Sequence, residues 1–338
     1  MLSVEIVIPS WNGQAILAQC LPSVLECARE VNPPARVTVV DDASTDDTVE
    51  WLWRNHPEVN VVALHLRRGF PGAVNEGVRA AQAEVVLLLN NDMIPHGTVL
   101  GPLIGHLADP AVAAVSARVL KWDAKTIDVG RRIRHLDRGE IAGVGHNEDF
   151  PEVSYTFFAS GGAMAFRRSL FLETGGFDEI YSPGYVEDTD FSYRMWKRGL
   201  QIIWEPRSTF LHMGSATFAP RKGGLARLFG LFRVRYLSNR NAFYFYWKNL
   251  TEESVRREYW RNLPRRIRQD KSPRADGHTD HIGGHAGHRE CSPSGHYRDR
   301  RIPQCPGRGG LGRANLRGSE RHQPTDQRQS KPHHPPNR

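Results

Sequence analysis

The sequence predicts an α/β fold, a mixed and mostly parallel sheet with helices on both faces. Two observations support this prediction. Short apolar strands alternate with helical segments through the first half of the chain, as expected when both faces of a sheet are covered. Acidic and amide side chains follow two of these strands, Asp41-Asp42 after the second and Asn90-Asn91-Asp92 after the fourth. Ligands of such sheets bind beyond the carboxyl ends of the strands, so a site is expected there.

The individual elements follow from short apolar runs separated by helical patterns. Strands are expected at residues 4–8, 36–40, 59–64, 84–89 and 201–204. Helices are expected at residues 14–29, 73–82, 168–173 and 188–198, and a further helix ends at His56 and is capped by Ser44 or Thr45. Residues 115–156 combine several glycines with polar side chains and predict hairpins and loops.

The positive charge lies in the last part of the chain. The formal net charge is +8, but residues 265–338 alone hold 16 Lys and Arg against 7 Asp and Glu. Residues 1–264 are close to neutral, with 29 Lys and Arg against 30 Asp and Glu. Residues 265–338 are rich in Arg, His, Gly and Pro, which predicts a disordered tail. The abrupt change of composition suggests the hypothesis of an out-of-frame extension.

Residues 216–264 are expected to form a helical, basic amphipathic extension. Between residues 225 and 247, apolar side chains alternate with Arg227, Arg233 and Arg235. Such a helix either lies in a membrane interface or packs back on the preceding domain while its arginines reach solvent. The chain has no apolar stretch of ~20 residues and does not open on a signal-peptide pattern. We therefore expect a cytoplasmic protein, either soluble or peripheral on the inner face of the cell membrane. The four cysteines show no disulfide framework, as is typical of that compartment.

Four segments carry the residues suited to chemistry. Each alone is weak, because an acidic pair after a strand is usually a turn or a helix cap. Their order along the chain and their placement at strand ends make a chance combination improbable. The segments are Ile8–Asn12, Val39–Thr48, Leu88–Asp92 and Glu187–Arg194.

In this combination the chain resembles glycosyltransferase family 2 and, within it, the rhamnosyltransferase-like branch. The match runs from Leu2 to about His212 and continues loosely to Arg240-Asn241. The resemblance implies an inverting enzyme of the GT-A fold, with a Rossmann-like nucleotide-binding sheet. Its catalytic domain would occupy residues 1–215, ahead of the extension at 216–264 and the tail at 265–338.

The resemblance assigns five residues to the nucleotide-sugar donor, a dTDP- or UDP-sugar. Asp42 matches an aspartate that accepts a hydrogen bond from the imide N–H of a pyrimidine base, which uracil and thymine both offer. Pro9 and Asn12 are expected to shape the base and ribose pocket, mainly through their backbone. Asn75 follows a glycine-containing loop at a helix start and is expected to bond the nucleotide or sugar. Asn91 is assigned to the same donor site.

The metal site is expected at Asp92 and His212. The segment Asn90-Asn91-Asp92 departs from the usual aspartate-x-aspartate motif, so only Asp92 is an anionic ligand. One carboxylate is sufficient where the donor phosphates supply the other ligands of Mg²⁺. His212 matches a family position that adds a second ligand, and its imidazole favours Mn²⁺ over Mg²⁺. The alternative for His212 is a histidine hydrogen-bonded within a loop.

Asp188 is expected to be the general base. An inverting transfer needs one carboxylate that takes the proton of the acceptor hydroxyl as this attacks the anomeric carbon. Glu187 would hold Asp188 in place or raise its pKa by like-charge proximity. The loop with Gly161 and Gly162 resembles family loops beneath the acceptor, where glycine allows close approach of a sugar. The alternative is an acidic helix start favoured by the helix dipole.

These residues predict an inverting transfer of a hexose or deoxyhexose, such as rhamnose, to a hydroxyl of a cell-surface glycan or lipid-linked precursor. A sugar-1-phosphate nucleotidyltransferase is a second hypothesis, but its Gly-rich, basic loop is absent after the first strand. A non-catalytic nucleic-acid or polyanion binder is a third hypothesis, motivated by the basic tail. That basicity lacks interleaved aromatics and lies outside the folded part, so no specific nucleic-acid partner is expected.

Overall fold

The computed structural model describes residues 2–137, 140–214 and 224–269. The chain divides into two compact units, residues 1–307 and 308–338, and the second lies outside the described residues. The predictions made for the tail at 265–338 therefore fall almost entirely outside the described residues. All the described residues belong to the first unit.

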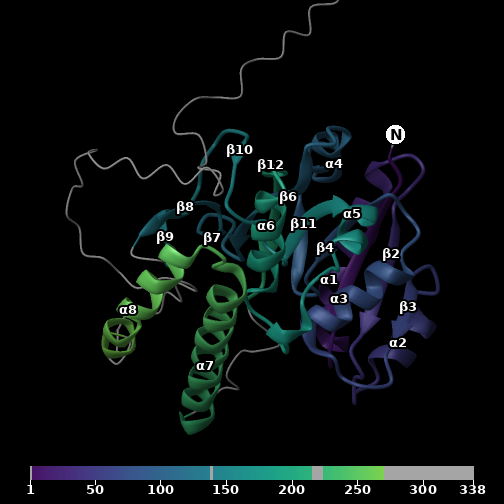
Figure 1. Ribbon diagram of the computed structural model, residues 1–338. Helices are drawn as coiled ribbons and strands as arrows, with labels where there is room; N and C mark the ends of the chain where they lie inside the picture. The colour runs from purple at the N-terminus through teal and green to yellow at the C-terminus, as the bar shows by residue number, and fades with distance from the viewer. Residues whose placement is uncertain (1, 138–139, 215–223, 270–338) are drawn as a thin grey trace, which may run out of the picture. The chain divides into compact units, whose positions relative to one another are not determined.

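A mixed sheet forms the centre of this unit (Figure 1). Its main path has the strand order β10-β12-β6-β11-β4-β1-β2-β3, with β5 paired to β12 and β7 paired to β6. The neighbours β4, β1, β2 and β3 are parallel, and so are β6 and β12, whereas β11 runs antiparallel to both β4 and β6. The predicted mixed, mostly parallel sheet is confirmed. The strands are β1 (Val4–Ser10), β2 (Arg36–Asp41), β3 (Asn60–Ala63), β4 (Val85–Leu89), β5 (Met93–His96), β6 (Val112–Lys121), β7 (Ile127–Val129), β10 (Ser154–Tyr155), β11 (Ala163–Arg167) and β12 (Gln201–His212); a separate hairpin pairs β8 (Arg131–Asp137) with β9 (Glu140–Glu148).

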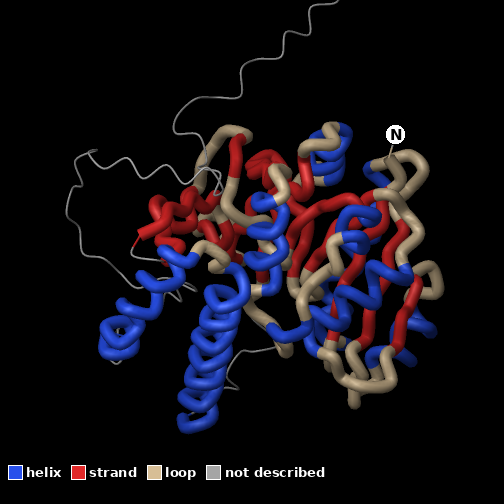
Figure 2. The backbone as a smooth tube through the Cα atoms, in the orientation of Figure 1, coloured by secondary structure: helices blue, strands red, loops and turns tan. Residues whose placement is uncertain are grey.

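Helices cover both faces of the sheet (Figure 2), because successive side chains of a strand point to opposite sides. In β1, Ile6 and Ile8 join one core with α1 and α4, whereas Val7 joins the other core with α3, α5 and α6. The helices are α1 (Gln14–Cys27), α2 (Thr48–Asn55), α3 (Gly69–Ala80), α4 (Leu100–Gly105), α5 (Arg168–Glu173), α6 (Glu187–Lys197), α7 (Gly224–Asn249) and α8 (Glu253–Gln269), with short 3₁₀ turns η1 (Ala28–Glu30), η2 (His106–Ala108) and η3 (Glu179–Tyr181).

The middle of the chain is more regular than its sequence predicts. Residues 115–156, where the sequence predicts hairpins and loops, contain the hairpin of β8 and β9 but also β7 and most of β6, whose side chains are largely buried. The interior strand β11 is not predicted from the sequence, which indicates only the loop with Gly161 and Gly162 before it. The strand expected at 201–204 extends to His212, because β12 continues through an irregularity between Glu205 and Thr209. Strands buried on both faces lack the alternation that marks a half-exposed strand, which explains these errors.

Helices α7 and α8 form a third hydrophobic cluster with residues of the preceding domain. Phe245 and Tyr246 of α7 are buried together with Tyr181 and Tyr193. Part of the surface of α7 therefore packs on the preceding domain, as one of the two sequence hypotheses proposed. Among the described residues, none of the helices is long and apolar enough to cross a bilayer.

Candidate active site

The carboxyl ends of β1, β2 and β4 lie side by side in the sheet, as their parallel pairing requires. Asp42 directly follows β2 and is almost fully buried. Its carboxylate oxygens accept the backbone N–H groups of Arg68 (2.6 Å) and Gly69 (2.8 Å) at the start of α3. Burial raises the pKa of Asp42, and these two hydrogen bonds oppose that shift. Asp42 thus ties the end of β2 to the glycine-containing loop before α3.

A second layer of this site is aromatic. The guanidinium carbon of Arg67 lies 3.3 Å from the centroid of the Trp11 ring, a close cation–π contact. Arg67 also approaches the carboxylate of Asp42, with 3.9 Å between Nε and Oδ2. Arg67 therefore contacts both the Trp11 ring and the carboxylate of Asp42.

The loops after β1 and β2 hold each other. Asn12 adopts a left-handed backbone conformation, with φ of 50°. Its side-chain oxygen accepts the N–H of Thr45 (2.8 Å), and its own N–H donates to Ser44 Oγ (2.8 Å). Asn91 donates its side-chain amide to Ser10 Oγ at 3.0 Å, which joins the ends of β1 and β4. These amides brace the loops, consistent with the expected shaping role of the β1 end, where Pro9 lies buried within the strand.

Asn75 occupies a different environment from the one expected. Its amide donates to the backbone carbonyl of Phe177 (2.8 Å) and accepts the N–H of the same residue (2.9 Å). The side chain is buried and joins α3 to the loop before η3. Direct bonding of Asn75 to the nucleotide stays a prediction, and it would require these two bonds to open.

Asp92 and His212 lie together, as the metal prediction requires. The antiparallel pairing of β5 with β12 sets His212 opposite Met93, next to Asp92. His212 Nε2 is 3.1 Å from Asp92 Oδ2, and His212 Nδ1 is 2.6 Å from Asp128 Oδ2. The imidazole therefore bridges two carboxylates. Asp128 belongs to β7 and was not singled out in the sequence.

The charge of the bridging imidazole follows from these contacts. Burial disfavours its protonated form, but the hydrogen bonds and charges of Asp128 and Asp92 outweigh burial and raise the pKa of His212 to about 9. The same contact with His212 lowers the pKa of Asp128. The imidazolium offsets one of the two negative charges of Asp92 and Asp128.

The donor set fits a divalent ion that takes only part of its ligands from protein. One carboxylate oxygen and one imidazole nitrogen converge from neighbouring strands, a combination suited to Mn²⁺ and tolerated by Mg²⁺. Within residues 2–137, 140–214 and 224–269, no group of three or more His, Cys, Asp or Glu could hold a metal by itself. The remaining ligands would come from amide or backbone oxygens, water or a bound diphosphate.

Asp188 lies in the first turn of α6, beneath the loop that leads into β11. Its Oδ2 accepts the N–H of Gly161 (2.9 Å), and its Oδ1 accepts the N–H of Thr189 (2.6 Å). Burial raises the pKa of Asp188, and these hydrogen bonds oppose the shift. A carboxyl whose pKa is raised toward the working pH is suited to general base catalysis.

Glu187 is the second carboxyl of this pair. It is 5 % exposed, and its Oε2 is buried without a hydrogen-bond partner. Burial and the adjacent charge of Asp188 raise the pKa of Glu187 well above its usual range. The sequence predicts that Glu187 raises the pKa of Asp188, whereas here the charge of Asp188 raises the pKa of Glu187, so Glu187 is the member of the pair that holds a proton more readily.

The glycines of the 160–162 loop bring the two carboxylate sites together. A Cβ on Gly162 would approach Met93 Cε at 2.7 Å and Asn90 Nδ2 at 3.2 Å. A Cβ on Gly161 would approach a Phe70 ring carbon at 3.3 Å and Asp188 Cβ at 3.5 Å. The loop therefore packs between the end of β4, next to the Asp92 site, and the start of α6.

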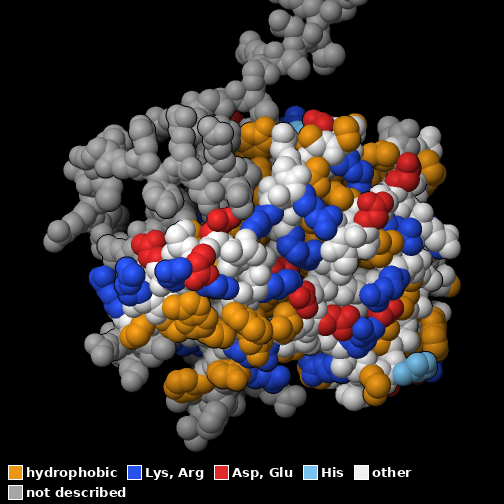
Figure 3. All heavy atoms as spheres, in the orientation of Figure 1, with side chains coloured by type: hydrophobic (Ala, Val, Ile, Leu, Met, Phe, Trp, Pro, Cys, Tyr) orange, Lys and Arg blue, Asp and Glu red, His pale blue; other side chains and the backbone are white. Residues whose placement is uncertain are grey.

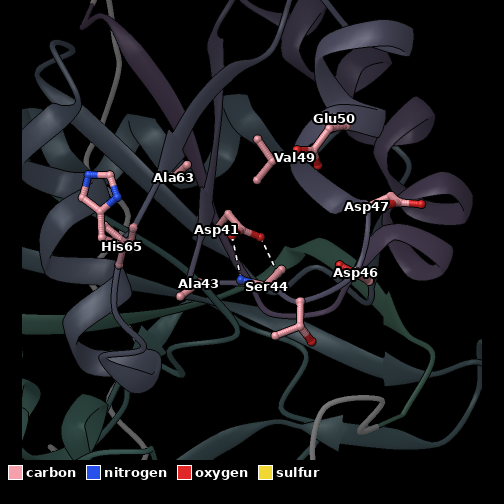
Figure 4. Close-up of a pocket in the computed structure, with 11 residues that line it drawn as sticks. Asp41, Ala43, Ser44, Asp46, Asp47, Val49, Glu50, Ala63 and His65 are labelled. Atoms are coloured by element: carbon pink, nitrogen blue, oxygen red, sulfur yellow. Dashed lines mark hydrogen bonds between the residues drawn. The ribbon is translucent and has the colours of Figure 1, made fainter.

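A pocket of about 490 Å³ opens beside this centre, at the ends of β2 and β3 (Figure 4). Asp41 lies inside it and braces the turn after β2, because its carboxylate accepts the N–H of Ser44 at 2.9 Å and the Ser44 hydroxyl. The pocket is acidic, with Asp46, Asp47 and Glu50 also in its wall. Asp42, Asp92 and Asp188 are not among its lining residues, so the pocket is separate from the part of the candidate site that these three carboxylates form.

The fold and the site together define a GT-A-type sugar-transferring domain. The family model for glycosyl transferase family 2 matches residues 5–175, and the chain belongs to this family. Nothing in the arrangement of the four motif segments conflicts with that membership.

Three curated proteins illustrate the likeness. A pre-mycofactocin glycosyltransferase of Mycobacterium tuberculosis is 28 % identical over 214 residues, 62 % of this chain and 42 % of the relative. The O-antigen chain rhamnosyltransferase RfbN of Salmonella typhimurium is 26 % identical over 65 % of this chain and 69 % of its own. An N-acetylglucosaminyl-diphospho-decaprenol L-rhamnosyltransferase of M. tuberculosis is 26 % identical over 53 % of this chain and 66 % of the relative. The chain thus spans less than half the length of the first relative.

Among solved structures, GalNAc-T7 with UDP, GalNAc and Mn²⁺ has a TM-score of 0.53 and 18 % identity, over 78 % of this chain and 55 % of that one. At this identity the likeness concerns the fold alone. It confirms the GT-A architecture that the sequence resemblance implied.

Proposed function

We propose that the protein is an inverting glycosyltransferase that moves a hexose or deoxyhexose from a nucleoside-diphosphate sugar to an acceptor hydroxyl. The observation that carries the proposal is the placement of Asp188, a half-buried carboxylate with a raised pKa, across a glycine loop from Asp92 and His212. A base on one side and a diphosphate anchor on the other are the two parts that a single displacement needs.

The proton step belongs to Asp188. Its carboxylate takes the proton of the acceptor hydroxyl while the hydroxyl oxygen attacks the anomeric carbon, and the bond from that carbon to the diphosphate oxygen breaks. The Gly161 N–H holds one carboxylate oxygen at 2.9 Å and so limits the rotation of the group. Glu187, protonated beside it, keeps a second negative charge away from the base. No protein nucleophile is required.

Asp92 and His212 would hold Mg²⁺ or Mn²⁺ on the donor diphosphate. A bound divalent ion stabilises the negative charge that develops on the leaving oxygen. The GalNAc-T7 structure contains UDP and Mn²⁺, which supports a divalent ion in this fold. As a ligand through Nε2, His212 would be neutral, and Asp128 would accept the hydrogen bond of its Nδ1–H and so hold the ring in place.

Donor recognition would use the aromatic layer. The base stacks on Trp11, near Asp42, whose buried carboxylate is available to an imide N–H through its remaining lone pairs. Uracil and thymine both offer that N–H. A dTDP- or UDP-sugar would therefore suit the site, and the relation to two rhamnosyltransferases includes rhamnose among the candidate sugars.

The direct test is calorimetric titration of the full chain with UDP-, dTDP- and GDP-sugars in the presence of Mn²⁺, followed by NMR of the transferred sugar. We expect a pyrimidine donor to bind in preference to the GDP-sugar, and the product to have the anomeric configuration opposite to that of the donor. Retention of configuration, or transfer of a nucleotide to a sugar phosphate, would exclude the proposed reaction in favour of a different one.

Asp128, the hydrogen-bond partner of His212, gives a second test. Replacing Asp128 with Asn is expected to weaken Mn²⁺ binding by about 10–100-fold, the usual loss when the carboxylate that hydrogen-bonds a metal-bound histidine is removed. Binding is measured by Mn²⁺ electron paramagnetic resonance, without substrate turnover. Asp149→Asn is the matched control, because Asp149 pairs with Arg118 on the surface and does not contact His212. Equal Mn²⁺ affinity of the Asp128→Asn variant and wild type would remove Asp128 from the site.

We also propose that the acceptor is lipid-linked and that α7 contacts the membrane. Large exposed side chains recur along one face of α7 at spacings of four, seven and four residues. Figure 3 shows hydrophobic side chains gathered over α7 and α8, with basic side chains around them. Arg233 and Arg235, both exposed, flank the stripe and suit anionic headgroups. The stripe consists of Phe232, Tyr236, Phe243 and Trp247, with Trp260 of α8 against Phe243.

Flotation with vesicles tests this surface. The double variant Phe232→Ser/Trp247→Ser is expected to bind phosphatidylglycerol vesicles at least about tenfold more weakly, because two side chains lose their apolar burial in the interface. Trp53→Ser is the matched control, since Trp53 is 60 % exposed on α2, outside the stripe. Equal flotation of all three proteins would leave the basic tail as the origin of any binding and would contradict the proposal for α7.

A further inference from the structure

The turn that delivers the catalytic carboxylates is held in an unfavourable backbone conformation. Tyr185 and Val186, directly before α6, have φ angles of +77° and +80°. This left-handed region costs of order 1–3 kcal/mol for a non-glycine residue, and it is least tolerated by a β-branched side chain such as Val. Glu187 and Asp188 follow at once. The direction in which α6 begins, and with it the position of Asp188, depends on whatever maintains these two residues.

The restraint comes from a residue pair on α7. The side-chain nitrogen of Asn241 lies within hydrogen-bond distance of three backbone carbonyls of the turn, those of Tyr181 (2.7 Å), Gly184 (2.9 Å) and Tyr185 (2.9 Å). Arg240 donates to a fourth carbonyl, that of Ser182, at 2.5 Å. Asn241 is fully buried, so water does not replace these donors.

The orientation of the Asn241 amide is fixed by its neighbour. Arg240 Nε donates to Asn241 Oδ1 at 2.9 Å, which identifies the oxygen end and turns the two amide hydrogens toward the turn. An aspartate at 241 would keep the shape but would face three carbonyl oxygens with a carboxylate. The arrangement therefore requires a donor, and the side chain at 241 is the one that supplies it to the carbonyls of both Gly184 and Tyr185.

We infer that Asn241, oriented by Arg240, is a positioning residue for the general base: it holds the left-handed turn at 185–186 so that α6 presents Asp188 to the acceptor hydroxyl. The inference rests on the proposed role of Asp188. It also gives α7 a catalytic purpose, because a helix about fifty residues downstream completes the geometry of the base without touching the substrate.

The test compares two buried amides of α7. Asn241→Ala is expected to lower kcat by about 100-fold, the loss that a misplacement of about 1 Å can cause, with little change in the KM for donor or in the Kd for Mn²⁺. Asn249→Ala is the matched control, since Asn249 is also buried but donates to Asp190 and not to the turn. Both variants should lose stability, whereas only Asn241→Ala should lose kcat when rates are compared at equal folded fraction. Equal kcat values in the two variants would overturn the inference.

A double-variant cycle separates this inference from the role of Asp188. If Asn241 acts through the base, Asn241→Ala should hardly change the residual rate of the Asp188→Asn enzyme, because effects of residues that act as a unit are not additive. A full additional loss in that background would show that Asn241 acts elsewhere. Normal activity of Asp188→Asn alone would instead refute the base assignment. Arg240→Gln, at a half-buried position, provides a milder variant with an expected tenfold or so loss of kcat by the same reasoning; unchanged kcat there and in Asn241→Ala counts against the clamp.

Discussion

Replacing Asp188 with Asn is expected to lower kcat by about 10²–10⁴-fold, the usual contribution of a positioned general base. Asparagine has the same shape, and its side-chain oxygen can still accept the Gly161 N–H that now holds the carboxylate. It cannot take a proton at neutral pH. The loss should therefore appear in the chemical step, measured as the rate of sugar transfer at saturating donor.

Binding controls make this result specific. The Kd values for the nucleotide sugar and for Mn²⁺ should stay within about twofold of wild type, because Asp92, His212 and Asp42 are unchanged. The Asp188→Asn enzyme should also retain its fold, since the substitution removes a buried charge whose ionisation burial already disfavours. If the variant transfers sugar at a near-normal rate with unchanged donor binding, another group is the base.

The pH dependence of the wild-type enzyme follows from the same carboxyl pair. Burial raises the pKa of Asp188, and burial with the charge of Asp188 raises that of Glu187 further. The base works only when ionised, so kcat should fall as pH falls through the raised pKa, at a higher pH than for a carboxyl in water. Glu187→Gln replaces a carboxyl that is already protonated beside the base, so the acid limb of the kcat profile should stay close to its wild-type position.

Much of the donor side of this molecule could be predicted from sequence, because local signals coincide there with topology. Asp42 and Asp92 each follow an apolar run, and parallel neighbours bring their carboxyl ends together without any knowledge of packing. His212 was found through a family resemblance. Its place opposite Met93 depends on a strand pairing between residues more than a hundred positions apart, which periodicity does not reveal.

The sequence does not reveal the role of residues that act by positioning other residues. Asp128 lies in the three-residue strand β7, which pairs with β6. Strand β6 pairs in turn with β12, which carries His212, and this arrangement brings the two side chains together. Asn75 has the type and place of a ligand-binding amide, yet its hydrogen bonds go to Phe177. Asn241 was noted as part of an Arg-Asn pair, but its partners are backbone carbonyls. Such roles are set by tertiary contacts, so a motif marks the position without giving its function.

Asp190 is expected to be the most sensitive position for stability in the described part of the chain. Its side chain is fully buried in α6 and accepts hydrogen bonds from two cations, Arg194 (2.9 Å) and Lys248 (3.0 Å). It also accepts hydrogen bonds from the hydroxyl of Tyr181 (3.0 Å) and the side-chain amide of Asn249 (2.8 Å). One carboxylate thus joins α6 to η3 and to α7.

Replacing Asp190 with Ala should lower the free energy of unfolding by about 3–5 kcal/mol, because breaking a buried ion pair from one side leaves charges buried without their counter-charge. For a domain of this size the thermal midpoint should fall by roughly 6–20 °C, which calorimetry measures directly. Glu253→Ala is the control: Glu253 also pairs with two arginines, but on the surface of α8, and its loss should hardly move the midpoint. A midpoint shift as small for Asp190→Ala as for this control would show that α7 is not fastened to α6 through Asp190.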